Sequence, residues 1–296
     1  MTTPRLTVEA LSAMSLRDGG RPILRRVSLV VDRGEVHGLV GESGAGKSTI
    51  AKAILGIIPS QVKVTGGEIG FEGSDLLTLS ANELRAVLGR DIALIPQDPS
   101  TALNPARRID AQMTDGLRLK GGLSARDART RAGDLLEEVQ IRDPERVLAS
   151  YPHQLSGGMR QRVLIAAAFG LEPKLVIADE PTTALDVTVQ KQILRLIRSM
   201  QERHGTSVLF VSHDLGVVAK ICDRLTVLYM GKVMEQGATA EVLAAPRHPY
   251  TRALLAANPR YDQPDSALQP TPPEVIAALR AEIAAFDARI VEPRNG

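Results

Sequence analysis

One short segment restricts the fold of this chain more than any other. Residues 41–49 read GESGAGKST, directly after the apolar run Val36–Val40 and directly before a segment with helical spacing, residues 50–55. Glycines let a backbone fold around an anion, and the N–H groups of the loop and of the helix start then point at it. A glycine-rich turn that binds nothing is the alternative. The strand, the loop, the Lys-Ser pair and the helix are all in register, so the segment predicts a phosphate-binding loop.

The loop predicts specific contacts with a nucleotide. Lys47 would supply positive charge to the β- and γ-phosphates, and the Ser48 hydroxyl would ligate Mg²⁺. The chain is therefore predicted to bind ATP with Mg²⁺. The expected nucleotide-binding residues are Gly41, Glu42, Ser43, Gly44, Ala45, Gly46, Lys47, Ser48 and Thr49.

Short apolar runs alternate with helical stretches along the chain. The runs are rich in branched residues, which is typical of strands in a largely buried sheet. Strands separated by helices imply an α/β fold with a mostly parallel sheet and crossover connections. The clearest helix begins near Asp186 and ends before Gly205, with an apolar stripe between them. The predicted strands are 27–31, 36–40, 92–95, 175–178, 208–212 and 225–230, and the stripe is Ile193, Leu194, Ile197 and Met200.

Two regions depart from this alternation. Between residues 100 and 154 the pattern is helical and polar, with a break at Gly121-Gly122, a helix start at Ser124 and an apolar face at Leu135, Leu136 and Val139. Strand signals stop after His248, and four prolines (264, 270, 272 and 273) mark a linker.

A last helix is predicted at residues 274–290. Its apolar residues are spaced 3, 4, 3 and 4 apart, which is a heptad seam of only two repeats. Docking on the chain's own domain and pairing with a partner helix both remain open, and the short seam favours docking. The seam is Ile276, Leu279, Ile283, Phe286 and Ile290.

Composition excludes several classes of protein. Lys and Arg number 36 against 34 Asp and Glu, a net charge of +2, so no strong nucleic-acid or membrane-surface footprint is expected. The longest apolar run, 163–171, is far shorter than the roughly 18 residues of a membrane span, and no secretory signal is readable, which indicates the cytoplasm.

The single cysteine, Cys222, excludes an intramolecular disulfide and a cysteine-rich metal site. It is interpreted as a small core residue, with a reactive thiol as the alternative.

An acidic pair ends a predicted strand at residues 175–180, LVIADE. Asp179 would join the Mg²⁺ shell, and Glu180, which points the other way, would polarise a water for attack on the γ-phosphate. Such a pair can equally be a solvated strand end. Beside a phosphate-binding loop it predicts a hydrolytic site.

A second helix start lies at 155–159, LSGGM. It can receive an anion but has no Lys-Ser pair. The economical explanation is a head-to-tail dimer in which Ser156, Gly157 and Gly158 close over the ATP of the opposite subunit. A helix capped by Ser and Gly is the alternative.

His213 follows the strand 208–212, at the sheet edge expected for Lys47 and Glu180, so it is predicted to reach the γ-phosphate.

In this order, the residues resemble the ATP-binding subunit of an ABC transporter, from Leu6 to about Ala257. The resemblance implies a P-loop NTPase of the ABC type, with a mostly parallel core, an antiparallel β region and a helical subdomain at about 100–165. It implies an ATP-binding domain at 1–257, followed by a linker and a helix at 258–296. It assigns Gln97 to the Q-loop, which senses Mg²⁺ and the attacking water, residues 155–159 to the signature motif, 184–186 to the D-loop and His213 to the switch histidine. The implied catalytic residues are Lys47, Gln97, Glu180 and His213, and the implied Mg²⁺ ligands are Ser48, Gln97 and Asp179.

Three segments are similar to the oligopeptide, dipeptide and nickel importer ATPases of bacteria: 97–105, 151–162 and 248–255. The similarity implies two membrane permeases, a second related ATPase subunit in a heterodimer, an indirect extracytoplasmic binding protein and no nucleic acid. It also implies a peripheral location on the cytoplasmic face of the inner membrane. The cargo stays open among peptides, nickel chelates and opine-like solutes.

The sequence departs from this family at two points. No cysteine follows Asn258, so no iron–sulfur cluster is expected. Ser15 and Leu16 occupy the region where an adenine-stacking aromatic is usual, which leaves the adenine contact unassigned. A soluble ABC-type ATPase in DNA repair or translation is the main alternative, but no second nucleotide domain, long coiled-coil insertion or zinc cysteines are visible. An exporter subunit is the third possibility, and the 248–255 segment favours import.

Overall fold

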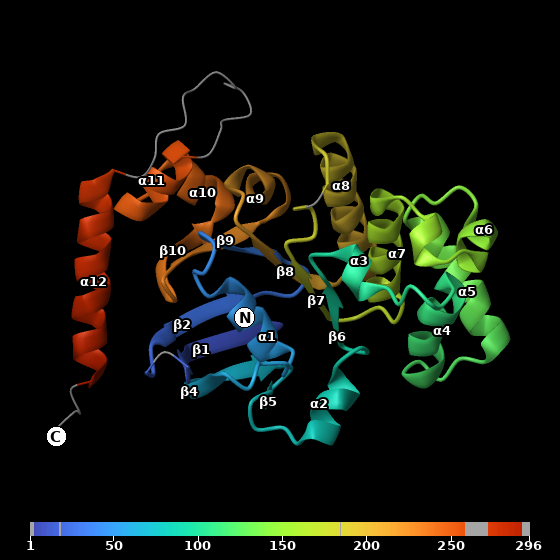
Figure 1. Cartoon of the computed structure of the whole chain (residues 1–296), viewed down its shortest axis with the longest axis horizontal. Helices are drawn as coiled ribbons and strands as arrows, with labels where there is room; N and C mark the ends of the chain where they lie inside the picture. The colour runs from blue at the N-terminus through green and yellow to red at the C-terminus, as the bar shows by residue number, and fades with distance from the viewer. Residues whose placement is uncertain (1–2, 18, 184, 258–271, 292–296) are drawn as a thin grey trace. The chain divides into compact units, whose positions relative to one another are not determined.

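The computed structural model describes residues 3–17, 19–183, 185–257 and 272–291. The chain forms two compact units (Figure 1). The P-loop unit comprises Leu6–Val30, His37–Leu77 and Ser212–Gly296, and the helical unit comprises Met1–Arg5, Val31–Val36 and Thr78–Val211. In the described ranges, no helix is both long enough and apolar enough to cross a membrane.

The P-loop unit contains an antiparallel sheet with the strand order β2-β1-β4-β5. These strands are β1 (Leu6–Ser15), β2 (Pro22–Val31), β4 (Val62–Phe71) and β5 (Ser74–Asp75). β4 runs antiparallel to both β1 and β5. The prediction that residues 27–31 join the buried parallel sheet is therefore wrong. Burial alternates along β2, which is the pattern of a strand buried on one face.

Parallel strands in the same unit carry the phosphate-binding loop. β3 (Val36–Val40) pairs in parallel with β9 (Arg224–Tyr229), and β10 (Lys232–Ala238) pairs with β9 in antiparallel orientation. All five residues of β3 are buried, as expected for a central strand. Cys222 is 8% exposed, and its Sγ lies 3.0 Å from the point where a Cβ on Gly38 would stand. The core-residue interpretation of Cys222 is confirmed.

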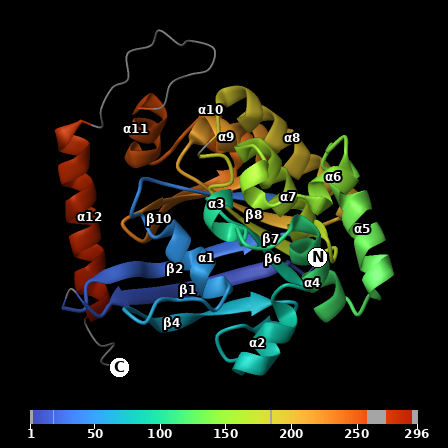
Figure 2. The same ribbon diagram turned by 45° about the vertical axis from the view of Figure 1, so that its right-hand side comes forward.

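The helices of the P-loop unit are α1 (Lys47–Ile54), α9 (Leu215–Ile221), α10 (Thr239–Ala244), α11 (Pro249–Ala257) and α12 (Pro273–Val291). The predicted last helix at 274–290 is confirmed to within one residue at each end. Leu279 and Ile283 are 2% and 4% exposed, so α12 docks on its own unit (Figure 2). The side chain of Ile290, the last residue of the predicted seam, lies outside the described residues.

The helical unit has the strand order β8-β7-β6, all parallel, from β6 (Ile92–Ile95), β7 (Leu175–Asp179) and β8 (Ser207–Ser212). Its helices are α2 (Ala81–Val87), α3 (Pro99–Ala102), α4 (Ile109–Leu119), α5 (Ala125–Glu138), α6 (Pro144–Ala149), α7 (Gly157–Phe169) and α8 (Val187–His204), with a short 3₁₀ turn at Pro152–Gln154. The helical region expected after Gln97 is thus present.

Local sequence signals fix the two long helices of this unit. Asp186 caps α8 by accepting hydrogen bonds from the backbone N–H groups of Thr188 and Val189, and Gly205 ends it in a left-handed conformation. Ser124 caps α5 by accepting from the N–H of Asp127. The apolar residues predicted for both helices are buried, with exposures of 5% or less: Leu135, Leu136, Val139, Ile193, Leu194, Ile197 and Met200.

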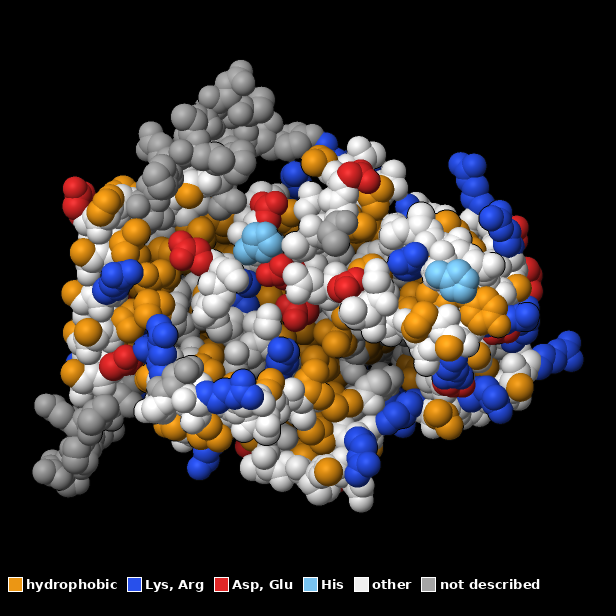
Figure 3. All heavy atoms as spheres, viewed as in Figure 1, with side chains coloured by type: hydrophobic (Ala, Val, Ile, Leu, Met, Phe, Trp, Pro, Cys, Tyr) orange, Lys and Arg blue, Asp and Glu red, His pale blue; other side chains and the backbone are white. Residues whose placement is uncertain are grey.

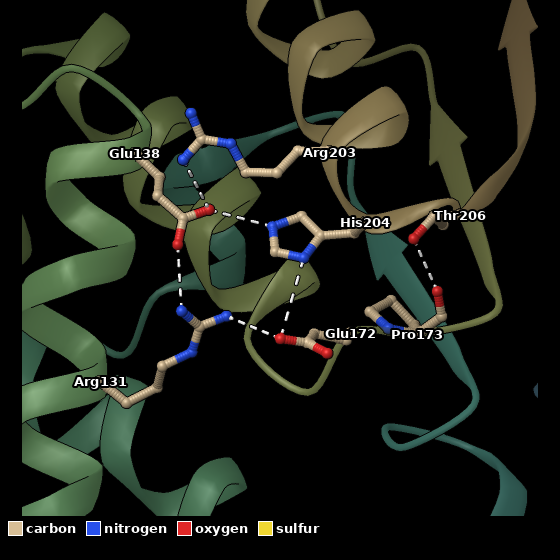
Figure 4. Close-up of polar contacts among 7 residues, drawn as sticks. All are labelled: Arg131, Glu138, Glu172, Pro173, Arg203, His204 and Thr206. Atoms are coloured by element: carbon tan, nitrogen blue, oxygen red, sulfur yellow. Dashed lines mark hydrogen bonds and ion pairs between the residues drawn. The ribbon is translucent and has the colours of Figure 1, made fainter.

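A cluster of charged side chains ties α5 to α8 (Figure 4). The Nε2 atom of His204 lies 3.0 Å from Glu138 Oε2, and Arg131 Nη1 donates to Glu138 Oε1 at 3.0 Å. Arg203 and Glu172 complete the cluster, with ion pairs to Glu138 and to Arg131. The histidine at the end of α8, His204, therefore has a structural role.

Candidate nucleotide site

The phosphate-binding loop depends on glycine at two close approaches. A Cβ on Gly41 would stand 2.1 Å from the carbonyl oxygen of Leu228, and one on Gly46 would stand 2.7 Å from Leu24 Cδ2. Gly46 also has a φ of +102°, in the left-handed region. At Gly41 and Gly46 the loop is packed against its own unit with no room for a larger side chain.

Lys47 is the first residue of α1 and is 5% exposed. Its Nζ donates to the carbonyl oxygens of Gly41 and Glu42 at 2.7 and 3.0 Å. These two hydrogen bonds hold the ammonium group against the phosphate-binding loop. The first turn of α1 carries no acidic residue, so the positive end of the helix dipole is not offset there.

Glu180 follows β7 in the helical unit with an unusual backbone conformation, a φ of +47°. Left-handed backbone is uncommon for a residue other than glycine and occurs where surrounding structure enforces it. Here the Glu180 N–H donates to the carbonyl oxygen of Val211 at 3.0 Å. Its carboxylate accepts from Gln97 Nε2 at 3.2 Å and from Thr183 Oγ1 at 3.0 Å.

This geometry brings two predicted catalytic residues, Gln97 and Glu180, into direct contact. It adds Thr183, which the sequence analysis missed because a threonine three residues after a carboxylate has no distinctive signal. Asp179 is half-buried at the last position of β7. Gln97 and Thr183 both donate to the same carboxylate oxygen of Glu180, Oε2, and so fix the orientation of the carboxylate.

The signature segment forms the start of α7. Ser156 caps the helix by accepting from the Met159 N–H at 3.3 Å, and Gly157 and Gly158 lie in the first turn. α7 begins at Gly157, directly after this cap, because the Ser156 side chain stabilises a helix start made of glycines, which have low helix propensity. Ser156 and Gly157 are exposed, and a Cβ on Gly157 would meet nothing within 4 Å.

His213 is exposed and directly follows β8. The next residue, Asp214, caps α9. Two other histidines have structural partners. His37 Nε2 lies 2.9 Å from Thr226 Oγ1, and His248 Nδ1 accepts from the Tyr250 N–H. In the predicted D-loop, Ala184 lies outside the described residues, and Asp186 caps α8.

Tyr250 is a contact of the phosphate-binding loop that sequence reasoning missed. Its hydroxyl accepts from the Glu42 N–H at 3.4 Å, and its ring packs on Tyr229 with centroids 4.6 Å apart. Tyr250 is 1% exposed, and this burial raises its pKa well above the usual range, so it stays protonated. The available signal was the segment 248–255, whose second and third residues, Pro-Tyr, begin α11.

The predicted site residues fall into two groups. Residues 41–49 and His213 belong to the P-loop unit, while Gln97, Ser156–Gly158, Asp179 and Glu180 belong to the helical unit. Within the described residues, no three His, Cys, Asp or Glu side chains gather as a metal site. Each unit offers an oxygen donor of the kind that Mg²⁺ prefers, the Ser48 hydroxyl in the P-loop unit and the Asp179 carboxylate in the helical unit.

Comparison with known proteins decides the family. Residues 24–183 match the family model described as "ABC transporter". The chain belongs to the ABC transporter family. It is an ATPase of that family, as predicted, and residues 234–284 also match the model "Oligopeptide/dipeptide transporter, C-terminal region".

Relatives and solved structures agree with this assignment. The chain is 49% identical to a probable D,D-dipeptide transport ATP-binding protein of Escherichia coli, over 92% of this chain and 84% of the relative. It is 46% identical to an oligopeptide transport ATP-binding protein of Bacillus subtilis, over 85% and 72%. A dimeric ATP-binding cassette in a post-hydrolysis state with ADP and Pi matches with a TM-score of 0.70 and 28% identity, over 79% of this chain and 98% of the cassette.

Proposed function

We propose that this chain hydrolyses ATP to drive uptake of peptides or related small solutes through two permease subunits at the cytoplasmic face of the inner membrane. The observation that carries the proposal is the match of residues 234–284 to the C-terminal region of oligopeptide and dipeptide transporters. Relatives named for dipeptide and oligopeptide transport support it. An extracytoplasmic solute-binding protein would deliver the cargo to the permeases. Nickel chelates and opine-like solutes are alternative cargoes within the same transporter family.

Separate groups of residues would bind the phosphates and Mg²⁺ during hydrolysis. The backbone of residues 41–49 and the Lys47 ammonium bind the phosphates, and Ser156, Gly157 and Gly158 of a second ATPase subunit close the site from the opposite side. A related but different subunit is the favoured partner. Ser48, Gln97 and Asp179 would hold Mg²⁺, which supplies charge neutralisation between the β- and γ-phosphates.

Glu180 is the proposed general base. It accepts the proton of a water that attacks the γ-phosphorus in line, the bond to the bridging oxygen breaks, and ADP leaves with phosphate as the second product. Gln97 orients the carboxylate through the hydrogen bond described above, and His213 contacts the γ-phosphate. Departure of the phosphate then reopens the dimer.

Co-purification tests the proposal. A tagged Glu180→Gln chain, expressed in its native host and trapped with ATP and Mg²⁺, is solubilised gently from membranes and its partners are identified. Two polytopic permeases and a second ATPase are expected. Recovery of ribosomal or DNA-bound proteins alone would contradict transport and leave the ATPase assignment intact.

A further inference from the structure

Arg25, on β2, joins the C-terminal helix to the turn beneath the phosphate-binding loop. Its side chain is 6% exposed, and its Nε and Nη2 atoms donate to the two carboxylate oxygens of Asp287 on α12, at 2.7 and 2.9 Å. Nη1 donates to the carbonyl oxygen of Met230. The backbone N–H of Arg25 donates to the carbonyl oxygen of Gly231 at 2.7 Å. One guanidinium thus binds a helix on one side and a turn on the other, which its forked geometry permits.

The turn formed by Met230 and Gly231 supports the loop directly. The Gly231 N–H donates to the carbonyl oxygen of Ala45, inside the phosphate-binding loop, at 2.8 Å. Met230 has a φ of +45°, an uncommon conformation for its residue type that the surrounding contacts must hold. A Cβ on Gly231 would stand 1.9 Å from the carbonyl oxygen of Ile23, so the backbones of β2 and of the turn are in close contact.

Other contacts keep α12 in place beside this turn. Leu279 and Ile283 are buried. Glu282 forms an ion pair with Lys232 on β10, and its Oε2 atom lies 3.4 Å from His248 Nε2. Along this flank of the molecule, hydrophobic side chains lie among side chains of both charges (Figure 3). The helix therefore presents Asp287 to Arg25 from a fixed position.

We propose that Arg25 is a positioning residue for nucleotide binding, and that Asp287 makes its action depend on the docking of α12. Without Asp287, a nearly buried guanidinium would lose its counter-charge and would shift or draw in water. The Met230 carbonyl, and through Gly231 the Ala45 segment of the loop, would then lose their fixed orientation. By linkage, nucleotide binding must strengthen the docking of α12 by the same factor. The inference rests on the phosphate-binding loop and not on the identity of the transported solute.

Titration of the full-length chain with ADP and Mg²⁺ by calorimetry tests the first half of the proposal. Asp287→Ala is expected to weaken ADP binding by about fivefold or more, the lower end of typical coupling between sites. Glu274→Ala, the matched control, removes an exposed carboxylate from the same helix and is expected to leave the affinity unchanged. Wild-type affinity in Asp287→Ala, or an equal loss in Glu274→Ala, would overturn the proposal.

A second variant guards against misfolding. Arg25→Lys keeps the charge but cannot bind Asp287 and the Met230 carbonyl with one planar group, so it should also weaken ADP binding. Far-UV circular dichroism without nucleotide reports whether each variant is folded. A folded Arg25→Lys chain with unchanged ADP affinity would refute the role of Arg25.

Hydrogen exchange tests the reciprocal half, which a purely structural role would not affect. ADP should slow amide exchange at residues 275–289 in the wild-type chain and fail to do so in Arg25→Lys. Unchanged exchange in the wild type at saturating ADP would overturn the coupling. A transporter that binds ADP normally but imports no peptide would instead contradict the proposed function and leave this inference standing.

Discussion

At the scale of single residues, the proposed hydrolysis depends on how Lys47 and Glu180 are held. The Lys47 ammonium group is kept at the loop by two carbonyl oxygens. The Glu180 carboxylate is fixed by two side-chain donors and by a left-handed backbone. Sequence motifs proposed both residues for the nucleotide site. They did not predict the direct contact between Gln97 and Glu180, because that contact joins residues 83 positions apart.

Lys47→Ala is expected to abolish ATP binding at millimolar nucleotide, because it removes the buried positive charge next to the phosphate-binding loop. Equilibrium dialysis with labelled ATP measures the loss. Lys52→Ala, on the same helix but in its last turn, is the control and should bind normally. ATP binding by Lys47→Ala at wild-type affinity would show that the backbone of the loop suffices.

Glu180→Gln is expected to bind ATP normally but to slow hydrolysis in the assembled transporter by about 10²- to 10⁴-fold, the usual contribution of a general base. Phosphate release measures the rate. Thr183→Val, which removes one donor to the carboxylate and leaves the base itself, should have a much smaller effect. If Glu180→Gln hydrolysed ATP at the normal rate, another group would be the base.

At the scale of elements, local signals decided where helices begin and end. The caps at Ser124 and Asp186 and the left-handed Gly205 were readable, because a cap satisfies N–H groups within a few residues of itself. At Ser156 the cap was only the alternative to a dimer contact. The strands β1, β4 and β10 were missed. Each is largely half-exposed or pairs across many residues, so its sequence carries no continuous apolar run.

Asp186→Ala is expected to destabilise the fold by about 1 kcal/mol, since the side chain caps two N–H groups of α8. Chemical denaturation followed by circular dichroism measures the change. Asp186→Asn keeps a capping oxygen and should cost a few tenths of that at most. Equal losses in the two variants would assign the effect to charge and not to the cap.

The lowered pKa of Glu138 predicts that the free energy of unfolding depends on pH. Burial raises the pKa of Glu138, but the hydrogen bond with His204 and the charge of Arg131 outweigh this and leave it below its usual value. A carboxyl whose pKa is lowered by folding stabilises the fold above its unfolded pKa and loses that contribution as pH falls through the folded value. The stability advantage of wild type over Glu138→Gln should therefore shrink from about pH 5 downward.

Urea denaturation at several pH values measures this advantage. Glu172→Gln removes the more exposed carboxylate of the same cluster, 65% exposed against 13%, and should show little pH dependence. An advantage of wild type over Glu138→Gln that stays constant from pH 6 to pH 3 would contradict the lowered pKa.

At the scale of the whole molecule, one chain contains a complete phosphate-binding loop and a signature segment whose Ser156 and Gly157 face solvent. The purified Glu180→Gln chain with ATP should sediment as a monomer, and as a dimer only after the related ATPase subunit is added. Analytical ultracentrifugation distinguishes these states. A tight homodimer with two bound ATP would contradict an obligate heteromer.

The sequence by itself determined the α/β class, the phosphate-binding loop, the helical region after Gln97 and the family, because each depends on residues close together in the chain. Only the tertiary structure decided that residues 27–31 belong to the antiparallel sheet, that Tyr250 supports Glu42, and that Arg25 joins Asp287 to the Met230–Gly231 turn. The physical reason is the sequence separation of these contacts: Arg25 and Asp287 are 262 residues apart. No local pattern specifies such a pair, which forms only when the fold brings α12 beside β2.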